Sequence, residues 1–172
     1  MEREQDILDK ISDKFVDGID KIFNYILSKI VKADIEVGKV SEIDEEKIKV
    51  LKERYKIEGI ILDVDETLRK DMADIPKCNK EWIEKLKQNF KIIVVSNGID
   101  KNVEEFLNKK DITYIGFAFK PLKKNFIKAC EKMNIKPENV LVIGDSLYED
   151  IYGGKRNKMK TAIVKEVDEE ER

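Results

Sequence analysis

The chain has 172 residues, of which 41% are hydrophobic, and its 34 basic and 36 acidic side chains give a net charge of −2. This length favours one sizeable core with an appendage over two full domains. The balance of charge argues against a nucleic-acid partner. Histidine is absent, which excludes Ser-His triads and His metal clusters and leaves carboxylates and lysines to carry any catalysis.

The two cysteines, Cys78 and Cys130, are isolated and form no Cys-x-x-Cys pair. A disulfide framework is therefore not expected, and a reducing, cytoplasmic location is favoured. Lysines and acids recur along the chain, so no apolar run reaches the ~20 residues that a membrane span needs.

The first predicted element is one long amphipathic helix over about residues 5–31. Its apolar stripe at helical spacing consists of Ile7, Ile11, Phe15, Ile19, Ile22, Ile26 and Ile30. Because so wide a stripe does not stay exposed in a monomer, we expect the helix to pack on the rest of the chain or on a second copy, as in a homo-oligomer. Peripheral contact with a membrane is the other interpretation, although anionic lipid would repel the acidic first half. A shorter helix is predicted to begin near Asp44.

From Ile57 onward, short β-branched runs alternate with charged helical stretches. The runs predict strands over residues 59–62, 92–95, 114–119, 140–143 and 161–164. Helices are predicted around residues 82–90, 101–110, 122–133 and 147–157. Strands this short and this uniformly apolar are typical of sheets that helices cover on both faces. The sequence therefore predicts an α/β fold with a doubly wound, five-stranded parallel sheet.

Polar side chains follow four of these runs, at the point where each predicted strand ends. In chain order they are Asp63, Asp65 and Thr67, then Ser96 and Asn97, then Lys120, then Asp145 and Asp150. Because the reactive loops of such a sheet gather beyond the carboxyl ends of its strands, we expect one polar site. Five further basic residues fall on the same loops, as is expected where about one residue in five is basic: Arg69, Lys70, Lys101, Lys123 and Lys124.

The acid pair at the first strand end indicates a metal. Asp63 and Asp65 stand two positions apart in an extended segment, so their carboxylates point the same way and repel each other unless a cation or a shared proton separates them. Bound Mg²⁺ is the simplest resolution. Asp145 would complete its site with Asp63 and the backbone carbonyl of Asp65.

Each residue type has a task in phosphoryl transfer, in which positioning and charge neutralisation dominate. Asp63 is the candidate nucleophile that forms an aspartyl phosphate, and Asp65 is the candidate general acid and base. The expected phosphate-binding residues are Thr67, Ser96, Asn97 and Lys120. Asp150 is expected to orient Lys120 or a metal-bound water.

These groups resemble the four motifs of the haloacid dehalogenase superfamily. The matching segments are Asp63-Val64-Asp65-Glu66-Thr67, Ser96-Asn97, Lys120-Pro121 and Gly144-Asp145-Ser146-Leu147-Tyr148-Glu149-Asp150. Residues 43–167 look like the YqeG-type branch of subfamily IIIA, some members of which are phosphatidylglycerophosphate phosphatases. One departure is Glu66, where this branch more often carries Asn; it adds a negative charge at the mouth of the site.

The intervals between the motifs are too short to hold an extra lid domain, so we expect an open site. Such a site suits a bulky substrate, such as a lipid head group or a phosphoprotein, better than a small sugar phosphate that needs enclosure. The expected organisation is an N-terminal helical extension over residues 1–40, a HAD-like catalytic domain without a cap over residues 41–168, and a charged tail over residues 169–172.

The leading hypothesis is a Mg²⁺-dependent phosphatase that works through an aspartyl phosphate, with phosphatidylglycerophosphate as the substrate that the resemblance suggests. The alternative substrates are a soluble phosphate ester or a phosphoprotein. A signalling receiver is disfavoured because the acid pair follows the first strand. A non-catalytic scaffold protein built around the first helix is the alternative from a different class.

Overall fold

The computed structural model describes residues 22–23 and 25–169, and the chain divides into two compact units, Met1–Lys32 and Ala33–Arg172. In the first unit, residues 22–23 and 25–30 are helical. Most of the predicted first helix and the end of the charged tail lie outside the described residues. No helix within the described ranges combines the length and the apolar character that crossing a membrane requires.

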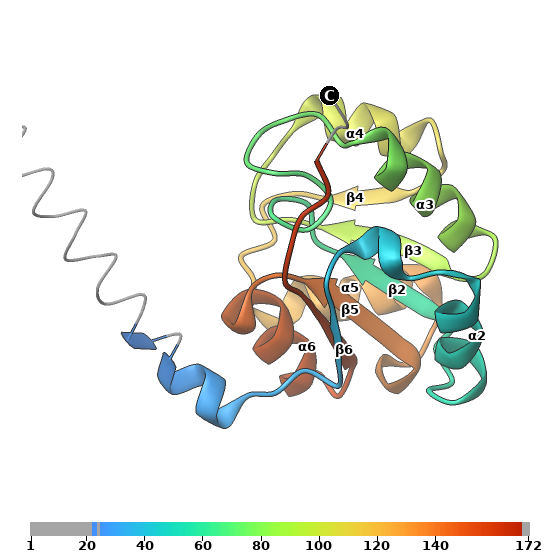
Figure 1. Cartoon of the computed structure of the whole chain (residues 1–172). Coiled ribbons are helices and arrows are strands. Elements are labelled where there is room, and N and C mark those ends of the chain that lie inside the picture. The colour runs from blue at the N-terminus through green and yellow to red at the C-terminus, as the bar shows by residue number, and fades with distance from the viewer. Residues whose placement is uncertain (1–21, 24, 170–172) are drawn as a thin grey trace, which may run out of the picture. The chain divides into compact units, whose positions relative to one another are not determined.

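The second unit is built on a parallel sheet of six strands in the order β1-β6-β5-β2-β3-β4 (Figure 1). The strands are β1 Ile35–Val37, β2 Gly59–Leu62, β3 Lys91–Val95, β4 Thr113–Ile115, β5 Val140–Gly144 and β6 Lys160–Val164. From β2 in the middle of the sheet, the chain adds β3 and β4 on one side. It then crosses to the other side and adds β5 and β6, next to β1. The prediction of a doubly wound parallel sheet is confirmed.

Two strands differ from the sequence prediction. The sixth strand, β1, pairs with β6 at the edge of the sheet and was missed because a three-residue strand leaves almost no pattern. Strand β1 belongs to the second unit, which begins at Ala33. Strand β4 ends at Ile115 rather than at residue 119, because Phe117 and Phe119 take left-handed backbone angles that no strand can contain.

The helices lie between the strands as the alternation predicts. They are α2 Glu45–Glu53, α3 Lys77–Lys87, α4 Lys101–Asn108, α5 Lys123–Met133 and α6 Gly153–Arg156, with a π-helical turn η3 Leu147–Tyr152 and 3₁₀ turns η1 Val40–Glu42 and η2 Pro137–Asn139. Asp44 caps α2 by accepting from the backbone N–H of Lys47. Asp100 caps α4 in the same way.

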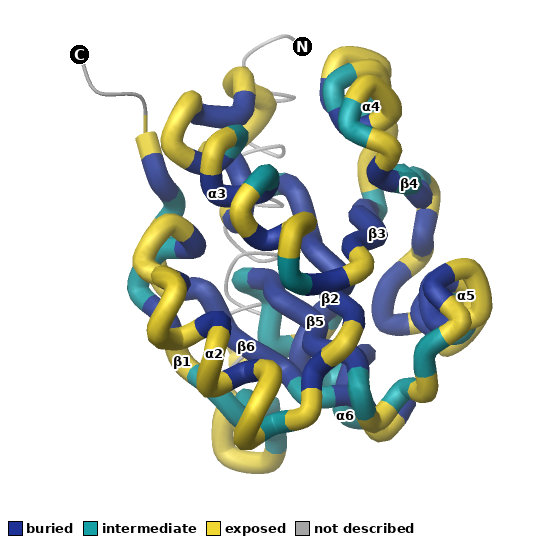
Figure 2. The backbone as a smooth tube through the Cα atoms, turned by 90° about the vertical axis from the view of Figure 1, so that its right-hand side faces the viewer, coloured by how far each residue is buried: buried dark blue, intermediate teal, exposed yellow. Residues whose placement is uncertain are grey.

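The sheet is buried on both faces, as Figure 2 shows by the dark strands beneath helices with exposed outer sides. Ile60 and Leu62 join a core with the inward side chains of α2, α3 and α4, whereas Ile61 joins a core with those of α5. Successive side chains of a strand point to opposite faces of the sheet, so β2 contributes to the core on each face. The packed sheet gives a rigid base to the loops that leave its carboxyl edge.

Candidate active site

The carboxyl edge of the sheet brings the predicted polar residues together. Leu62 of β2 is paired with Val94 of β3 and with Ile143 of β5, so the loops that follow these strands begin side by side. The backbone N–H of Asp63 continues this register by donating to the carbonyl of Ile143 at 3.0 Å.

Lys120 lies at the centre of the site. Its side chain is only 1% exposed, and its Nζ donates to Oδ1 of Asp63 at 2.6 Å and to Oδ1 of Asp150 at 2.7 Å. The other oxygen of Asp150 accepts from the backbone N–H of Ser146 at 3.2 Å. Lys120 is thus fixed between two carboxylates, and Asp150 is in turn fixed by the loop after β5.

Burial and mutual repulsion perturb the acids. Burial, together with the charge of Asp150, raises the pKa of Asp63 to about 6. Burial, together with the charge of Asp63, raises the pKa of Asp145 to about 6. Burial also raises the pKa of Asp150. Burial lowers the pKa of Lys120, but Asp150 and Asp63 more than offset this, so its net pKa is raised and it stays charged.

Three of the carboxylates form a candidate metal centre. Asp63, Asp145 and Asp150 each offer an oxygen, and these oxygens lie within 4.8 Å of one another. When all three are ionised, the ammonium of Lys120 neutralises one of the charges, so two negative charges remain uncompensated. The all-oxygen donor set and this excess charge fit a hard divalent cation such as Mg²⁺. The cluster includes the carboxylate of Asp150, which the sequence analysis assigned to a supporting role.

The hydroxyl and amide residues divide into two groups. Thr67 is fully buried, and its Oγ1 lies 3.3 Å from Oδ2 of Asp63 and 3.4 Å from Oδ1 of Asp145, so it bonds within the acidic cluster. Buried Ser96 accepts from the backbone N–H of Gly98 at 3.1 Å. Asn97 instead accepts from the backbone N–H of Lys120 at 2.6 Å, which ties two site loops together.

Asp65 is held by a residue whose role the sequence analysis missed. Nε of Arg69 donates to Oδ1 of Asp65 at 2.8 Å, and Nη1 of Arg69 donates to Oδ2 of Asp100 at 2.7 Å and to the carbonyl of Ala73 at 3.2 Å. Arg69 is buried, so it does not present its charge to an approaching anion. The signal in the sequence is only a spacing of four residues between Asp65 and Arg69.

The loop between Asp65 and Arg69 is tightly turned. Glu66 takes a left-handed backbone angle, with φ of 57°, and its Oε1 accepts from the backbone N–H of Asp71 at 2.7 Å. The glutamate that departs from the family pattern therefore closes the loop on itself. Its charge nevertheless contributes to raising the pKa of Asp145.

The described segments that join the strands of the site carry no lid domain. Within residues 33–169, the segment from β2 to β3 holds only a loop and α3, and the segment from β3 to β4 holds only α4. Neither segment contains a further domain that could cover the acids.

A parallel α/β sheet that gathers carboxylates, a lysine and hydroxyls at its carboxyl edge is suited to phosphoryl transfer. A family model, haloacid dehalogenase-like hydrolase, matches residues 9–157. The chain belongs to this family.

Two similar proteins indicate which kind of hydrolase the chain is. The chain is 37% identical over 141 residues to a Bacillus subtilis (strain 168) protein named "Probable phosphatase YqeG", a match that covers 81% of this chain and 80% of that protein. It is 28% identical to glyceraldehyde 3-phosphate phosphatase of Pyrococcus furiosus, over 55% of this chain and 43% of that protein. The chain is therefore an enzyme of the HAD phosphatase type, a phosphoric monoester hydrolase.

Among solved structures, one from Vibrio cholerae carries a provisional assignment as a 3-deoxy-D-manno-octulosonate 8-phosphate phosphatase. It superposes with a TM-score of 0.56 at 13% identity, over 72% of this chain and 73% of that chain. At this identity the likeness supports the fold alone. It agrees with the sheet topology described above.

Proposed function

We propose that the protein is a Mg²⁺-dependent phosphatase that passes the phosphoryl group of a phosphate monoester through Asp63 to water. The observation that carries this proposal is the buried carboxylate of Asp63, which receives Lys120 on one oxygen and lies within reach of Thr67 on the other. A carboxylate whose two oxygens are both held in place loses little conformational entropy on reaching the transition state, which supports its role as the nucleophile.

In the first half-reaction, an oxygen of Asp63 bonds to phosphorus while the bond from phosphorus to the ester oxygen breaks. Asp65 gives its proton to the departing oxygen. In the second half-reaction, Asp65 takes a proton from water as the water oxygen attacks the aspartyl phosphate, which releases inorganic phosphate and restores Asp63.

Mg²⁺ bound by Asp63, Asp145 and the backbone carbonyl of Asp65, with Asp150 beside them, would offset the negative charge of the phosphate. The donor set described above supports this assignment. Lys120 and Ser96 bind the remaining phosphate oxygens, Thr67 hydrogen-bonds in the cluster, and Asn97 positions Lys120.

The open mouth favours a bulky phosphate ester, and a lipid head group of the phosphatidylglycerophosphate kind is the substrate that the family resemblance suggests. A small soluble ester is the second candidate, because the Pyrococcus furiosus relative is named for one. The ratio of kcat/KM on the lipid to kcat/KM on a panel of soluble phosphates, at equal Mg²⁺, separates the two. Equal values would remove the lipid assignment.

The chemistry itself is tested with p-nitrophenyl phosphate. We expect turnover by the wild type that EDTA abolishes and added Mg²⁺ restores, and no turnover by Asp63→Asn. Asp71→Asn is the matched control, because Asp71 is an exposed carboxylate on the same loop with a backbone angle that Asn tolerates. Activity that survives Asp63→Asn would refute the nucleophile, and a wild type inactive on every phosphate ester would favour a scaffold protein.

A further inference from the structure

Four exposed apolar side chains lie on the loops that form the site. They are Ile99 at 48%, Phe117 at 60%, Phe119 at 65% and Leu122 at 59% exposure. We call these four residues the apolar rim. The loops that carry them are in contact, because the backbone N–H of Phe117 donates to the carbonyl of Gly98 at 3.3 Å and Ile99 packs beside Gly116.

Specific contacts hold the backbone of the rim in a defined conformation. Phe117 and Phe119 hold left-handed backbone angles, with φ of 47° and 50°, which bulky residues avoid at a cost of about 1 kcal/mol or more each. Their rings stack with centroids 6.3 Å apart. Ala118 between them is buried, and its N–H donates to the carbonyl of Ser96 at 3.0 Å. The strained backbone therefore anchors one small residue inside and turns two aromatic rings outward.

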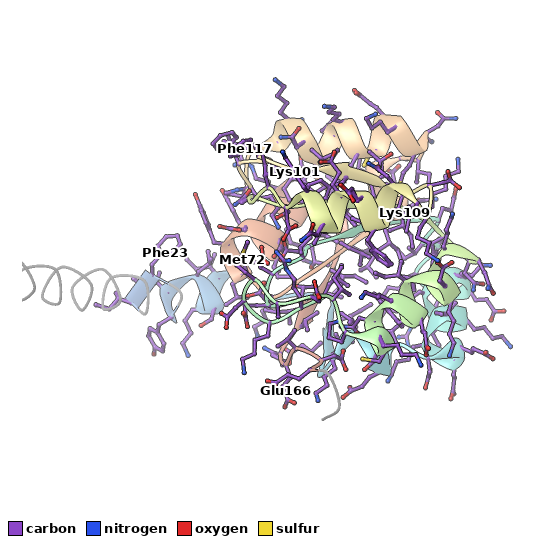
Figure 3. All side chains as sticks on the ribbon, turned by 90° about the horizontal axis from the view of Figure 1, so that it is seen from above. Phe23, Met72, Lys101, Lys109, Phe117 and Glu166 are labelled. Atoms are coloured by element: carbon purple, nitrogen blue, oxygen red, sulfur yellow. The ribbon has the colours of Figure 1, made fainter. Side chains whose placement is uncertain are left out.

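The segment that carries most of the rim is basic. Residues 112–130 contain four lysines and no acidic residue, in a chain whose net charge is −2. Lys120 is engaged in the site, whereas Lys123 and Lys124 are exposed directly after Leu122. Figure 3 shows Phe117 on the same side of the domain as Lys101 and Met72, which is itself 70% exposed.

We propose that the apolar rim docks the catalytic domain onto an anionic phospholipid bilayer, with the mouth of the site facing the lipid head groups. Aromatic rings that enter the interface beside lysines that meet lipid phosphates form the combination that peripheral membrane surfaces use. Because residues 112–130 contain no acid, this segment itself is not repelled by an anionic membrane. The proposal rests on the proposed function in that docking would bring a membrane-anchored phosphate ester to Asp63.

Flotation of the full-length protein with vesicles tests the docking. We expect binding to vesicles of phosphatidylcholine with added phosphatidylglycerol that weakens as salt is raised. The variant Phe117→Asn/Phe119→Asn, in which Asn tolerates the left-handed angles, should bind at least about tenfold more weakly because two large apolar groups leave the interface. Lys123→Gln/Lys124→Gln should lose about fivefold per lysine on anionic vesicles and nothing on neutral ones.

The matched control lies in the first unit. Ile26→Asn/Ile30→Asn removes two exposed apolar side chains from the helical segment there and should leave vesicle binding unchanged. Binding that is lost in this variant and kept in the Phe117/Phe119 variant would overturn the proposal and assign the membrane contact to the first helix. A wild type that binds neither vesicle would also overturn it and direct the search to an acidic protein partner.

Enzyme assays separate this proposal from the proposed function. The Phe117/Phe119 variant should hydrolyse p-nitrophenyl phosphate at the wild-type rate and lose activity only on a lipid phosphate presented in vesicles. Equal loss on both substrates would mean that the rim supports folding of the site instead of docking. A wild type that floats with vesicles but hydrolyses no phosphate ester would refute the proposed function and leave the docking surface standing.

Discussion

Replacing Arg69 with methionine removes the group that holds the proposed general acid in place. In the wild type, Arg69 is 3% exposed and joins Asp65 and Asp100 in one ion-pair chain at 2.8 and 2.7 Å. Methionine keeps the apolar stem and most of the volume but leaves both carboxylates without their partner. Asp65 is then free to sample other rotamers, while Asp63 and the acidic cluster are untouched.

The expected losses follow from exposure. Breaking a fully buried ion pair costs about 3–5 kcal/mol, whereas an exposed pair is worth about 0–1 kcal/mol. The side chains of Asp65 and Asp100 are 39% and 17% exposed, so we expect Arg69→Met to lower the free energy of unfolding by about 2 kcal/mol. General acid and base catalysis contributes about 10²–10⁴ in rate, and an Asp65 that is present but mobile should forfeit about 10–100-fold of it.

The assay compares two leaving groups. An alkyl phosphate such as glycerol phosphate needs a proton on its departing oxygen, whereas p-nitrophenolate departs without one. We expect Arg69→Met to lower kcat/KM on the alkyl ester far more than on p-nitrophenyl phosphate, because kcat/KM reports the steps up to departure of the leaving group and excludes the later hydrolysis of the aspartyl phosphate. Asp100→Asn, which keeps the α4 cap but breaks the outer pair, is the control and should retain most activity. The same fractional loss on both substrates would refute the positioning argument and leave Arg69 a purely structural residue.

Three further outcomes are expected. Lys120→Met should abolish turnover and lower the free energy of unfolding by about 3–5 kcal/mol at neutral pH, measured by urea denaturation, because two buried carboxylates lose their partner. In EDTA, the melting temperature should fall as pH rises from about 4 to 6, because Asp63 and Asp145 have a pKa of about 6 in the folded protein and 3.8 in the unfolded chain. Mg²⁺ should cancel this fall. A melting temperature that rises over this range in EDTA would contradict the pKa directions. Gly144→Ala should destabilise the fold and lower kcat, because its Cβ would collide with the carboxylate of Asp150, whereas Gly98→Ala should fold normally with its nearest contact at 3.6 Å.

Sequence patterns were sufficient for the layered fold because the β-branched runs are uniformly apolar, as strands buried on both faces are, and alternate with charged helical stretches. They were insufficient where structure depends on distant partners. Strand β1 exists only because β6 offers it an edge, and three residues carry no period of their own. The end of β4 was misplaced because Phe117 and Phe119 look like strand residues, whereas their backbone angles depend on how Ala118 is anchored to Ser96.

The candidate site shows the same division. Asp63, Lys120 and Asp145 could be placed together from the parallel topology alone, since carboxyl ends of neighbouring strands share an edge. The task of Asn97, which ties down the backbone of Lys120, and the pairing of Arg69 with Asp65 depend on loop conformations that strand order does not determine.

Rapid quench of the enzyme during steady hydrolysis of a phosphate ester, followed by borohydride reduction and peptide mass spectrometry, examines Asp63 most directly. Borohydride converts an acyl phosphate into the corresponding alcohol, so the expected result is homoserine at position 63 in the wild type with substrate and Mg²⁺, and none in EDTA or in Asp63→Asn. A wild type that turns over substrate while Asp63 remains unlabelled, or in which another residue carries the label, would contradict the account.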